Sequence, residues 1–231
     1  MRTDKVRDFK PELYMVGLWR YECERVFCDK LVNNKDKDVI LNAINDFSSE
    51  CFGMTEEINE KFSRDKFFAF ADFLTPDERD EEGTIINFGP RTYEAVSDVE
   101  VLRKRAYECM EDFNLEPKNT KKLELVLFND ALKHLLKIVR IIRQPRSSAL
   151  LVGVGGSGKQ SLTRLASSIE RMEYKQIELV KNYAEKDLKE DLKKYIEITG
   201  RFGKNCCFIL TDSEIKKEEF LEYISMILST G

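Results

Sequence analysis

The second half of the chain alternates between short apolar runs and longer amphipathic stretches. Apolar runs of this length predict buried strands, and amphipathic stretches predict helices that pack on them. The predicted order is strand 149–153, helix 159–171, strand 176–180, helix 184–199, strand 205–211 and helix 217–229. In the middle helix, Leu188, Leu192 and Ile196 recur every four residues and predict the face that packs on the sheet. This alternation predicts an α/β fold in which crossover helices join parallel strands.

The first half of the chain is mainly helical by the same criteria. Its predicted elements are a helix at about 11–30, a helix at 37–49, a buried strand at 66–74, and helices at 97–113 and 121–143. The apolar stripe predicted for the first helix consists of Val16, Trp19, Cys23, Val26 and Phe27. The acidic run 77–83 predicts a solvated turn. The helix at 121–143 is apolar on most faces and is expected to be buried until Pro145 ends it.

Composition indicates a soluble, globular, intracellular protein. The chain has 42% hydrophobic residues and a net charge of −4, which argues against nucleic acid as a partner because binding phosphates needs a basic excess. No apolar segment is long enough to span a bilayer, so no membrane partner is expected. The six cysteines show no paired spacing and predict reduced core residues. A single histidine, His134, excludes a multi-histidine metal site and is interpreted as a plain helix residue; no protein-only metal site is predicted.

Residues 149–163 have the layout of a phosphate-binding loop, in which an apolar run leads into a glycine-rich turn and then a helix. The glycines allow backbone N–H groups to converge on phosphate oxygens, and the helix beginning near Lys159 points its positive end at the same place. The residues predicted to contact phosphate are Gly153, Val154, Gly155, Gly156, Ser157, Gly158, Lys159, Gln160 and Ser161.

Two positions depart from the pattern of an active nucleotide hydrolase. The residue after the lysine is Gln160, where a Ser or Thr would hold Mg²⁺, and Ser161 comes one place late. The apolar run 206–211 ends in Asp212, the form of a strand whose carboxylate holds the Mg²⁺ water shell. The next residue, Ser213, is a poor general base. If the strand continues to Glu214, that carboxylate lies on the same side as Asp212 and is the candidate catalytic group.

Several segments together resemble the fourth AAA+ module of axonemal-type dynein heavy chains. They are residues 143–146, 150–166 and 211–215, with residues 70–73 and 125–128 resembling the entry of that module. Residues 18–27 are similar to the helical lid that closes the third module. The resemblance implies three parts: a lid-like segment at 1–64, a helical entry region at 65–146, and an incomplete P-loop core at 147–231.

This resemblance implies a nucleotide-binding part of a ring-shaped microtubule motor, located in the cytoplasm, the cytoskeleton and the axoneme of cilia or flagella. ATP or ADP with Mg²⁺ would bind with Lys159 on the β- and γ-phosphates, Asp212 acting through Mg²⁺, and Ile142 and Gln144 near the adenine. The implied partners are the other AAA+ modules of the heavy chain and, through the intact protein, intermediate chains, light chains and microtubules. Arg20 is either part of the third module's nucleotide sensor or an exposed helix arginine.

The resemblance also implies a sheet with strand order 5-1-4-3-2, of which the chain contains the first three strands. Without the fourth strand, we expect an unfilled gap with open hydrogen-bonding edges between the first and third strands, weak ATP binding and hardly any hydrolysis. Two alternatives stay open. One is an independent P-loop enzyme such as a small kinase, and the other is an interaction module with a vestigial nucleotide site.

Overall fold

The computed structural model describes two compact units of the chain, Met1–Arg105 and Ala106–Gly231, and each is considered by itself. The described residues are 11–53, 66–83, 85–96, 98–119 and 121–230. Helix α4 (Val99–Leu115) crosses the boundary between the units. The glycine-rich loop and Asp212 both belong to the second unit.

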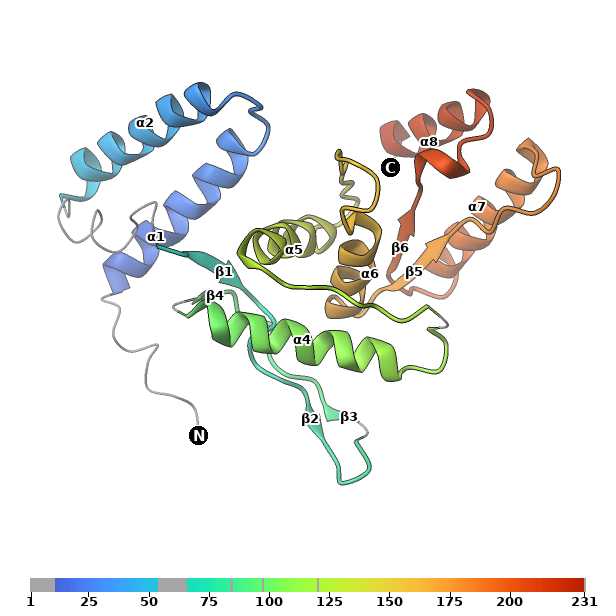
Figure 1. Cartoon of the computed structure of the whole chain (residues 1–231), viewed down its shortest axis with the longest axis horizontal. Coiled ribbons are helices and arrows are strands. Elements are labelled where there is room, and N and C mark those ends of the chain that lie inside the picture. The colour runs from blue at the N-terminus through green and yellow to red at the C-terminus, as the bar shows by residue number, and fades with distance from the viewer. Residues whose placement is uncertain (1–10, 54–65, 84, 97, 120, 231) are drawn as a thin grey trace. The chain divides into compact units, whose positions relative to one another are not determined.

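The first unit combines helices with two small antiparallel strand pairs (Figure 1). In chain order its elements are α1 (Pro11–Cys23), a π-helical turn (Glu24–Cys28), α2 (Asn34–Phe52), β1 (Ala69–Ala71), β2 (Glu78–Arg79), β3 (Ile85–Asn87) and β4 (Glu94–Val96). Strand β1 pairs with β4, and β2 pairs with β3. Helix α2 begins where the Asn33 side chain accepts a hydrogen bond from the backbone N–H of Lys35, and it ends at Gly53, whose φ of 64° suits glycine.

The apolar stripe predicted for the first helix is wrong in its second half. Val16 is buried, but Trp19, Val26 and Phe27 are exposed. The helix changes from α to π geometry at Glu24, and the wider turn shifts the face that Val26 and Phe27 present, whereas Trp19 lies before it in α1. The buried residues of α1 are Leu13, Val16, Gly17 and Arg20. The interpretation of Arg20 as an exposed helix arginine is therefore wrong, and its burial lowers the pKa of the guanidinium.

The strand predicted at 66–74 is real but shorter, because only β1 forms a ladder. All three residues of β1 are buried, as expected, and the Phe70 ring lies 5.4 to 5.6 Å from four aromatic rings. These rings belong to Tyr14, Tyr21, Phe68 and Tyr93. The acidic run that follows forms part of the exposed β2–β3 hairpin, which confirms the solvated turn.

The second unit contains one parallel strand pair with helices around it. Its elements after α4 are α5 (Asn129–Ile142), α6 (Lys159–Ile169), β5 (Glu173–Gln176), α7 (Glu185–Gly200), β6 (Cys206–Ile209), a 3-10 turn (Asp212–Glu214) and α8 (Glu219–Thr230). Strands β5 and β6 pair in parallel from Glu173↔Cys206 to Gln176↔Ile209, and α7 is the crossover helix between them. The α/β class and the parallel crossover are confirmed for this pair, which is the neighbouring second and third strand of the expected order.

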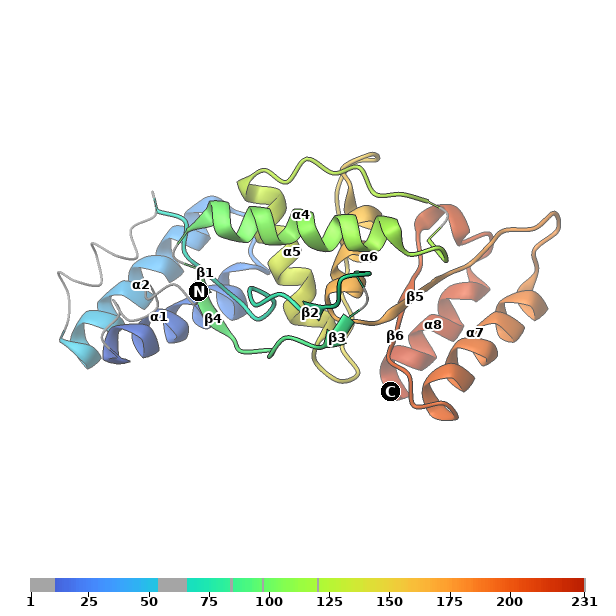
Figure 2. The same cartoon turned by 90° about the horizontal axis from the view of Figure 1, so that it is seen from below.

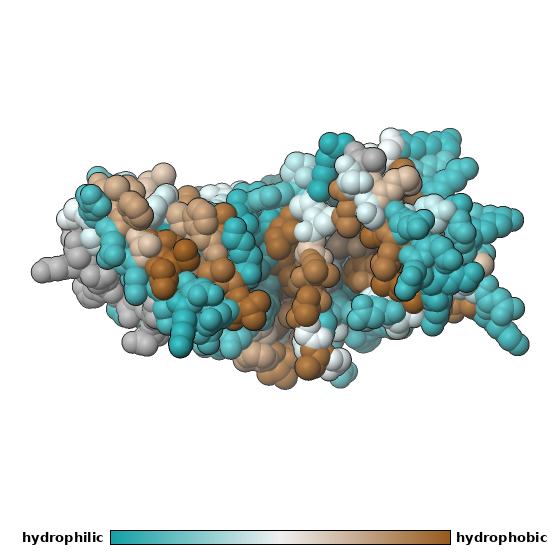
Figure 3. Space-filling model, turned by 90° about the horizontal axis from the view of Figure 1, so that it is seen from above, coloured by the Kyte–Doolittle hydropathy of each residue, from teal (hydrophilic) through white to brown (hydrophobic). Residues whose placement is uncertain are grey.

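A complete parallel sheet is not seen, since residues 149–153 form no strand within the part of the chain that the structure describes. Their apolar side chains are largely open to solvent, with Leu150 90% and Val152 86% exposed. Figure 3 shows hydrophobic residues, in brown, at the surface of the molecule. The predicted strand is therefore wrong as a paired element, because a strand needs a neighbour to exchange backbone hydrogen bonds with.

Two further boundaries differ from the prediction. The second strand lies at β5 instead of 176–180. The helix predicted from residue 121 begins only at Asn129, because side chains hold the backbone before it in extended form. Asn114 Oδ1 accepts from the Leu123 N–H at 2.7 Å, and Tyr107 Oη accepts from the Leu127 N–H at 3.1 Å.

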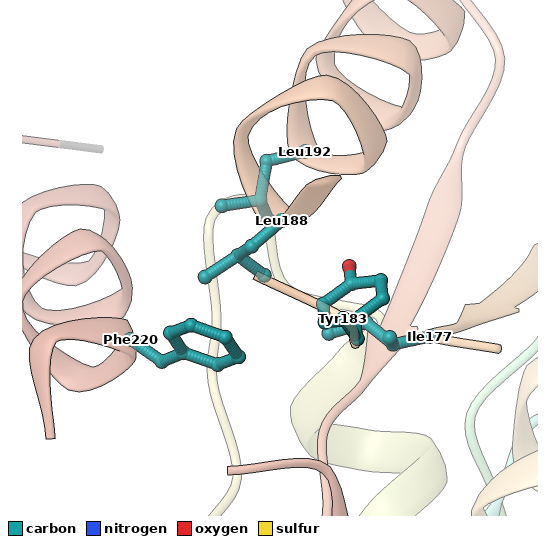
Figure 4. Packing of buried hydrophobic residues seen from close by; sticks show 5 residues of the cluster. All are labelled: Ile177, Tyr183, Leu188, Leu192 and Phe220. Atoms are coloured by element: carbon teal, nitrogen blue, oxygen red, sulfur yellow. The ribbon is translucent and has the colours of Figure 1, made fainter. Parts of the chain in front are cut away.

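A hydrophobic cluster forms where α7 and α8 flank the strand pair (Figures 1, 2 and 4). Its buried members are Ile177, Tyr183, Leu188, Leu192 and Phe220. The face predicted for α7 is confirmed at Leu188 and Leu192 but not at Ile196, which is 57% exposed. In the second half of α7, Tyr195 makes the contact with the strands instead, with its ring 5.4 Å from that of Phe208.

The cysteines are reduced, but they are not all core residues. Cys28 and Cys109 are buried, whereas Cys51 is exposed because it lies in the last turn of α2, beyond the buried positions of that helix. Burial raises the pKa of the Cys206 thiol to about 11 and raises that of Cys207.

His134 lies exposed on α5, which confirms it as a plain helix residue. Within the described ranges, no helix is long and apolar enough to cross a membrane. The same ranges contain no cluster of three or more His, Cys, Asp or Glu side chains placed to hold a metal ion.

Candidate functional site: a glycine-rich loop at a helix N-terminus

The glycine-rich loop leads directly into α6 (Figure 1). Gly156 and Gly158 both have φ of 75°, a left-handed conformation that strains any other residue. Gly158 is the N-cap of α6, and its carbonyl accepts the first helical hydrogen bond from the Leu162 N–H at 2.8 Å. The N–H groups of the first turn are therefore turned toward the loop, where they form an anion-binding helix N-terminus.

The Lys159 ammonium lies inside the loop. Its Nζ donates to Gly153 O at 2.8 Å, Val154 O at 2.7 Å and Ser157 Oγ at 3.0 Å. A cation with three donors thus lies beside the glycine backbone and the helix N-terminus. Phosphate oxygens are strong acceptors for such an ammonium, so the arrangement fits a polyphosphate.

The loop is open on one side, and on the other Gly158 lies against Leu125. Residues 153–157 are exposed, and a Cβ added to Gly155 or Gly156 would meet nothing within 4 Å. A Cβ on Gly158 would instead lie 3.4 Å from Leu125 Cδ2. The open side leaves room for a ligand, and Gly158 is favoured by its left-handed backbone conformation.

Gln160 is exposed in the first turn of α6, and Ser161 is half-buried after it. Successive helical residues are about 100° apart around the axis, so Ser161 points elsewhere and does not replace a hydroxyl at position 160. The roles of both residues in phosphate binding stay predictions. The chemistry at position 160 is that of a neutral amide.

Asp212 begins the 3-10 turn that follows β6, and it is exposed. The strand ends at Ile209, so the condition that it continues to Glu214 is not met, and period-two spacing does not place the two carboxylates on one side. Thr211 caps the turn instead, and its N–H donates to Glu214 Oε2 at 2.8 Å. This bond turns the Glu214 carboxylate back into the protein, where it is only 4% exposed.

Two polar residues that the sequence reasoning missed complete this part of the site. Gln176 Nε2 donates to Glu214 Oε1 at 2.6 Å, and Arg164 Nη2 donates to Gln176 Oε1 at 2.7 Å. Both oxygens of Glu214 are thus engaged, and its catalytic role stays a prediction that this geometry does not favour. A glutamine that ends a half-buried strand was the available signal, but sequence spacing alone does not show which carboxylate it meets.

Ile142 is the last residue of α5, and Gln144 lies in the turn that leads to the loop. The Gln144 N–H donates to Ile141 O at 3.0 Å, which keeps this turn close to the helix end. Helix α5 packs against α6, so this turn and the loop lie on neighbouring elements. Contact of Ile142 and Gln144 with adenine stays a prediction.

Comparison with known proteins assigns the second unit to a class. Residues 123–231 match the family model described as "P-loop containing dynein motor region D4". This match, the loop and the parallel strand pair define an AAA-type motor region.

The whole chain is similar to long motor proteins. It is 38% identical to dynein axonemal heavy chain 6 of Homo sapiens over 224 residues, which cover 96% of this chain. It is 40% identical to dynein axonemal heavy chain 5 of Mus musculus over 226 residues, or 94% of this chain. The chain spans 5% of the length of each of these relatives. The chain belongs to the dynein heavy chain family.

Proposed function

We propose that the chain is a regulatory nucleotide-binding module of an axonemal dynein heavy chain. Its loop at 153–161 holds the phosphates of ATP or ADP, and Asp212 acts through the bound Mg²⁺. The observation that carries this proposal is the Lys159 ammonium, which lies within 3.0 Å of three loop oxygens at the N-terminus of α6.

The module binds nucleotide and hydrolyses it weakly or not at all. Gln160 offers no hydroxyl for Mg²⁺, and Ser213 is a poor general base. The remaining carboxylate, Glu214, is buried with both oxygens hydrogen-bonded. Glu214, the described carboxylate that follows Asp212 most closely in the sequence, is therefore not placed to activate a water molecule.

The remaining assignments concern the intact protein and follow from its relatives. The module acts within a microtubule-based motor of the axoneme in cilia or flagella. Its partners are the other AAA+ modules of the same heavy chain, and the whole protein assembles with intermediate chains, light chains and microtubules. Ile142 and Gln144 lie near the adenine of the bound nucleotide.

The test is titration of fluorescent ATP and ADP into the chain with and without Mg²⁺. Mg²⁺ should tighten ATP binding by about tenfold, as one added charge-assisted contact of about 1.5 kcal/mol would. Asp212→Asn should bind equally without Mg²⁺ and lose most of that tightening. Asp130→Asn, an exposed carboxylate in the first turn of α5, is the matched control and should retain it.

Each result separates the candidate functions. The same Mg²⁺ effect in Asp212→Asn and the wild type would remove Asp212 from the site. Absence of nucleotide binding in the wild type would favour an interaction module with a vestigial loop. ATP turnover that disappears in Glu214→Gln would favour an independent P-loop ATPase.

A further inference from the structure

A continuous path of hydrogen bonds joins the loop helix to the turn that carries Asp212. It runs from Arg164 on α6, through the Gln176 side chain at the end of β5, to Glu214 and on to the Thr211 N–H. Its three hydrogen-bond lengths are 2.7, 2.6 and 2.8 Å. Helix α6 packs on both β5 and β6, so the path crosses the second unit from the loop helix to the turn.

Gln176 is the only uncharged side chain in this path. Its amide lies between the Arg164 guanidinium and the Glu214 carboxylate and can bond to both. The amide oxygen accepts from Arg164, and the amide nitrogen donates to Glu214. Its backbone is held as well, because it pairs with Ile209 of β6 and its carbonyl accepts from Tyr195 Oη at 3.3 Å. Burial raises the pKa of Tyr195 to about 12, so the phenol keeps its proton at neutral pH.

Arg164 depends on few contacts. Its guanidinium carbon lies 5.5 Å from the centre of the Tyr174 ring, and its buried Nε has no hydrogen-bond partner among the described residues. The bond to Gln176 and the ring contact therefore hold its side chain between α6 and β5. Loss of the Gln176 side-chain oxygen would break the bond to Arg164 and so disconnect α6 from the turn that contains Asp212.

The other end of the path fixes the backbone on both sides of Asp212. The Glu214 side chain accepts from the Thr211 N–H, and the Glu214 N–H donates to Thr211 O at 2.9 Å. Asp212 lies between these residues and its carbonyl accepts from the Ile215 N–H at 3.2 Å. The backbone position of Asp212 is thus set by a turn whose buried anchor is Glu214.

We propose that Gln176 is a positioning residue that couples the loop helix to the Asp212 turn, so that tightening of nucleotide binding by Mg²⁺ depends on it. This inference rests on the proposed function, since Mg-nucleotide is the ligand whose binding it controls. Gln176 acts through Arg164 and Glu214 and does not itself contact the nucleotide.

The test exchanges donor and acceptor in the hydrogen bond between residues 176 and 214. Gln176→Glu keeps the side-chain shape and the acceptor for Arg164, but it directs a second carboxylate at Glu214. Adding Glu214→Gln to it should restore the contact, because the amide nitrogen introduced at position 214 donates to the carboxylate introduced at position 176, while the amide oxygen still accepts from Thr211. The single variant should lose the roughly tenfold effect of Mg²⁺ and keep Mg²⁺-free binding, and the double variant should regain the effect.

A second measurement does not need nucleotide. Hydrogen exchange at the Thr211 amide should be faster in Gln176→Glu and return toward the wild-type rate in the double variant, since this amide donates to Glu214. An unchanged Mg²⁺ effect in Gln176→Glu, or a loss that the double variant does not restore, would overturn the coupling. If wild-type chain fails to bind nucleotide, the proposed function fails, and the exchange rates still decide whether Gln176 holds the turn.

Discussion

Replacing Phe220 by alanine is expected to lower the free energy of unfolding by about 3–5 kcal/mol. The ring is only 1% exposed and belongs to one buried cluster with Leu188 and Leu192 of α7 and with Tyr183 (Figure 4). The Tyr183 and Phe220 rings meet edge to face, with centroids 6.1 Å apart. Truncation removes apolar contacts within the cluster and leaves a cavity that the crossover helix cannot fill without moving.

Chemical denaturation followed by circular dichroism measures this effect. Leu221→Ala is the matched control, because Leu221 is the next residue of α8 and is 47% exposed. The control should lose less than about 1 kcal/mol, as exposed positions do. Equal losses for the two variants would show that α8 is not held to the strand pair by this cluster.

Lys159→Ala is expected to weaken binding of fluorescent ATP roughly 10- to 100-fold. Hydrogen bonds to a charged group contribute about 1.5–3 kcal/mol each, and 1.4 kcal/mol corresponds to a tenfold change in affinity. The substitution removes the charge that meets the phosphates. It also removes three bonds that hold Gly153, Val154 and Ser157 around the ammonium, so the loop loses its shape as well.

Lys193→Ala is the control for loss of a positive charge. Lys193 lies exposed on α7 and takes no part in the loop. Its variant should bind like the wild type, and both variants should unfold at nearly the wild-type temperature, since neither lysine belongs to the hydrophobic cluster. Binding by Lys159→Ala that equals the wild type would exclude the loop as the phosphate site.

The elements that sequence predicted best are those whose cause is local. Helices α6, α7 and α8 follow from apolar residues at helical spacing, and the loop before Lys159 follows from glycines, which adopt φ of 75° without strain. The parallel pairing of β5 with β6 was also predicted, because a helix that joins two strands of one sheet favours a parallel crossover, although β5 lies before the apolar run predicted at 176–180.

The errors lie where the outcome depends on a distant neighbour. The apolar run at 149–153 has strand character but forms no ladder in the described structure, because pairing is decided by another strand. The period of two placed the Glu214 side chain beside Asp212 only if the strand reached residue 214, but the strand ends at Ile209. Hydrogen bonds from the Thr211 N–H and the Gln176 amide direct the Glu214 carboxylate instead. No spacing rule connects residues 176 and 214, since their contact is made by the fold.

The most direct test of the central claim is hydrogen exchange of the chain, measured by mass spectrometry with and without ATP and Mg²⁺. The claim is that backbone N–H groups of residues 153–161 bind phosphate. Their exchange should therefore slow when nucleotide is added, together with that of the turn at 211–214, and in Lys159→Ala both changes should need a roughly 10- to 100-fold higher nucleotide concentration. Unchanged exchange at 153–161 under conditions where nucleotide is bound, or protection confined to other segments, would contradict it.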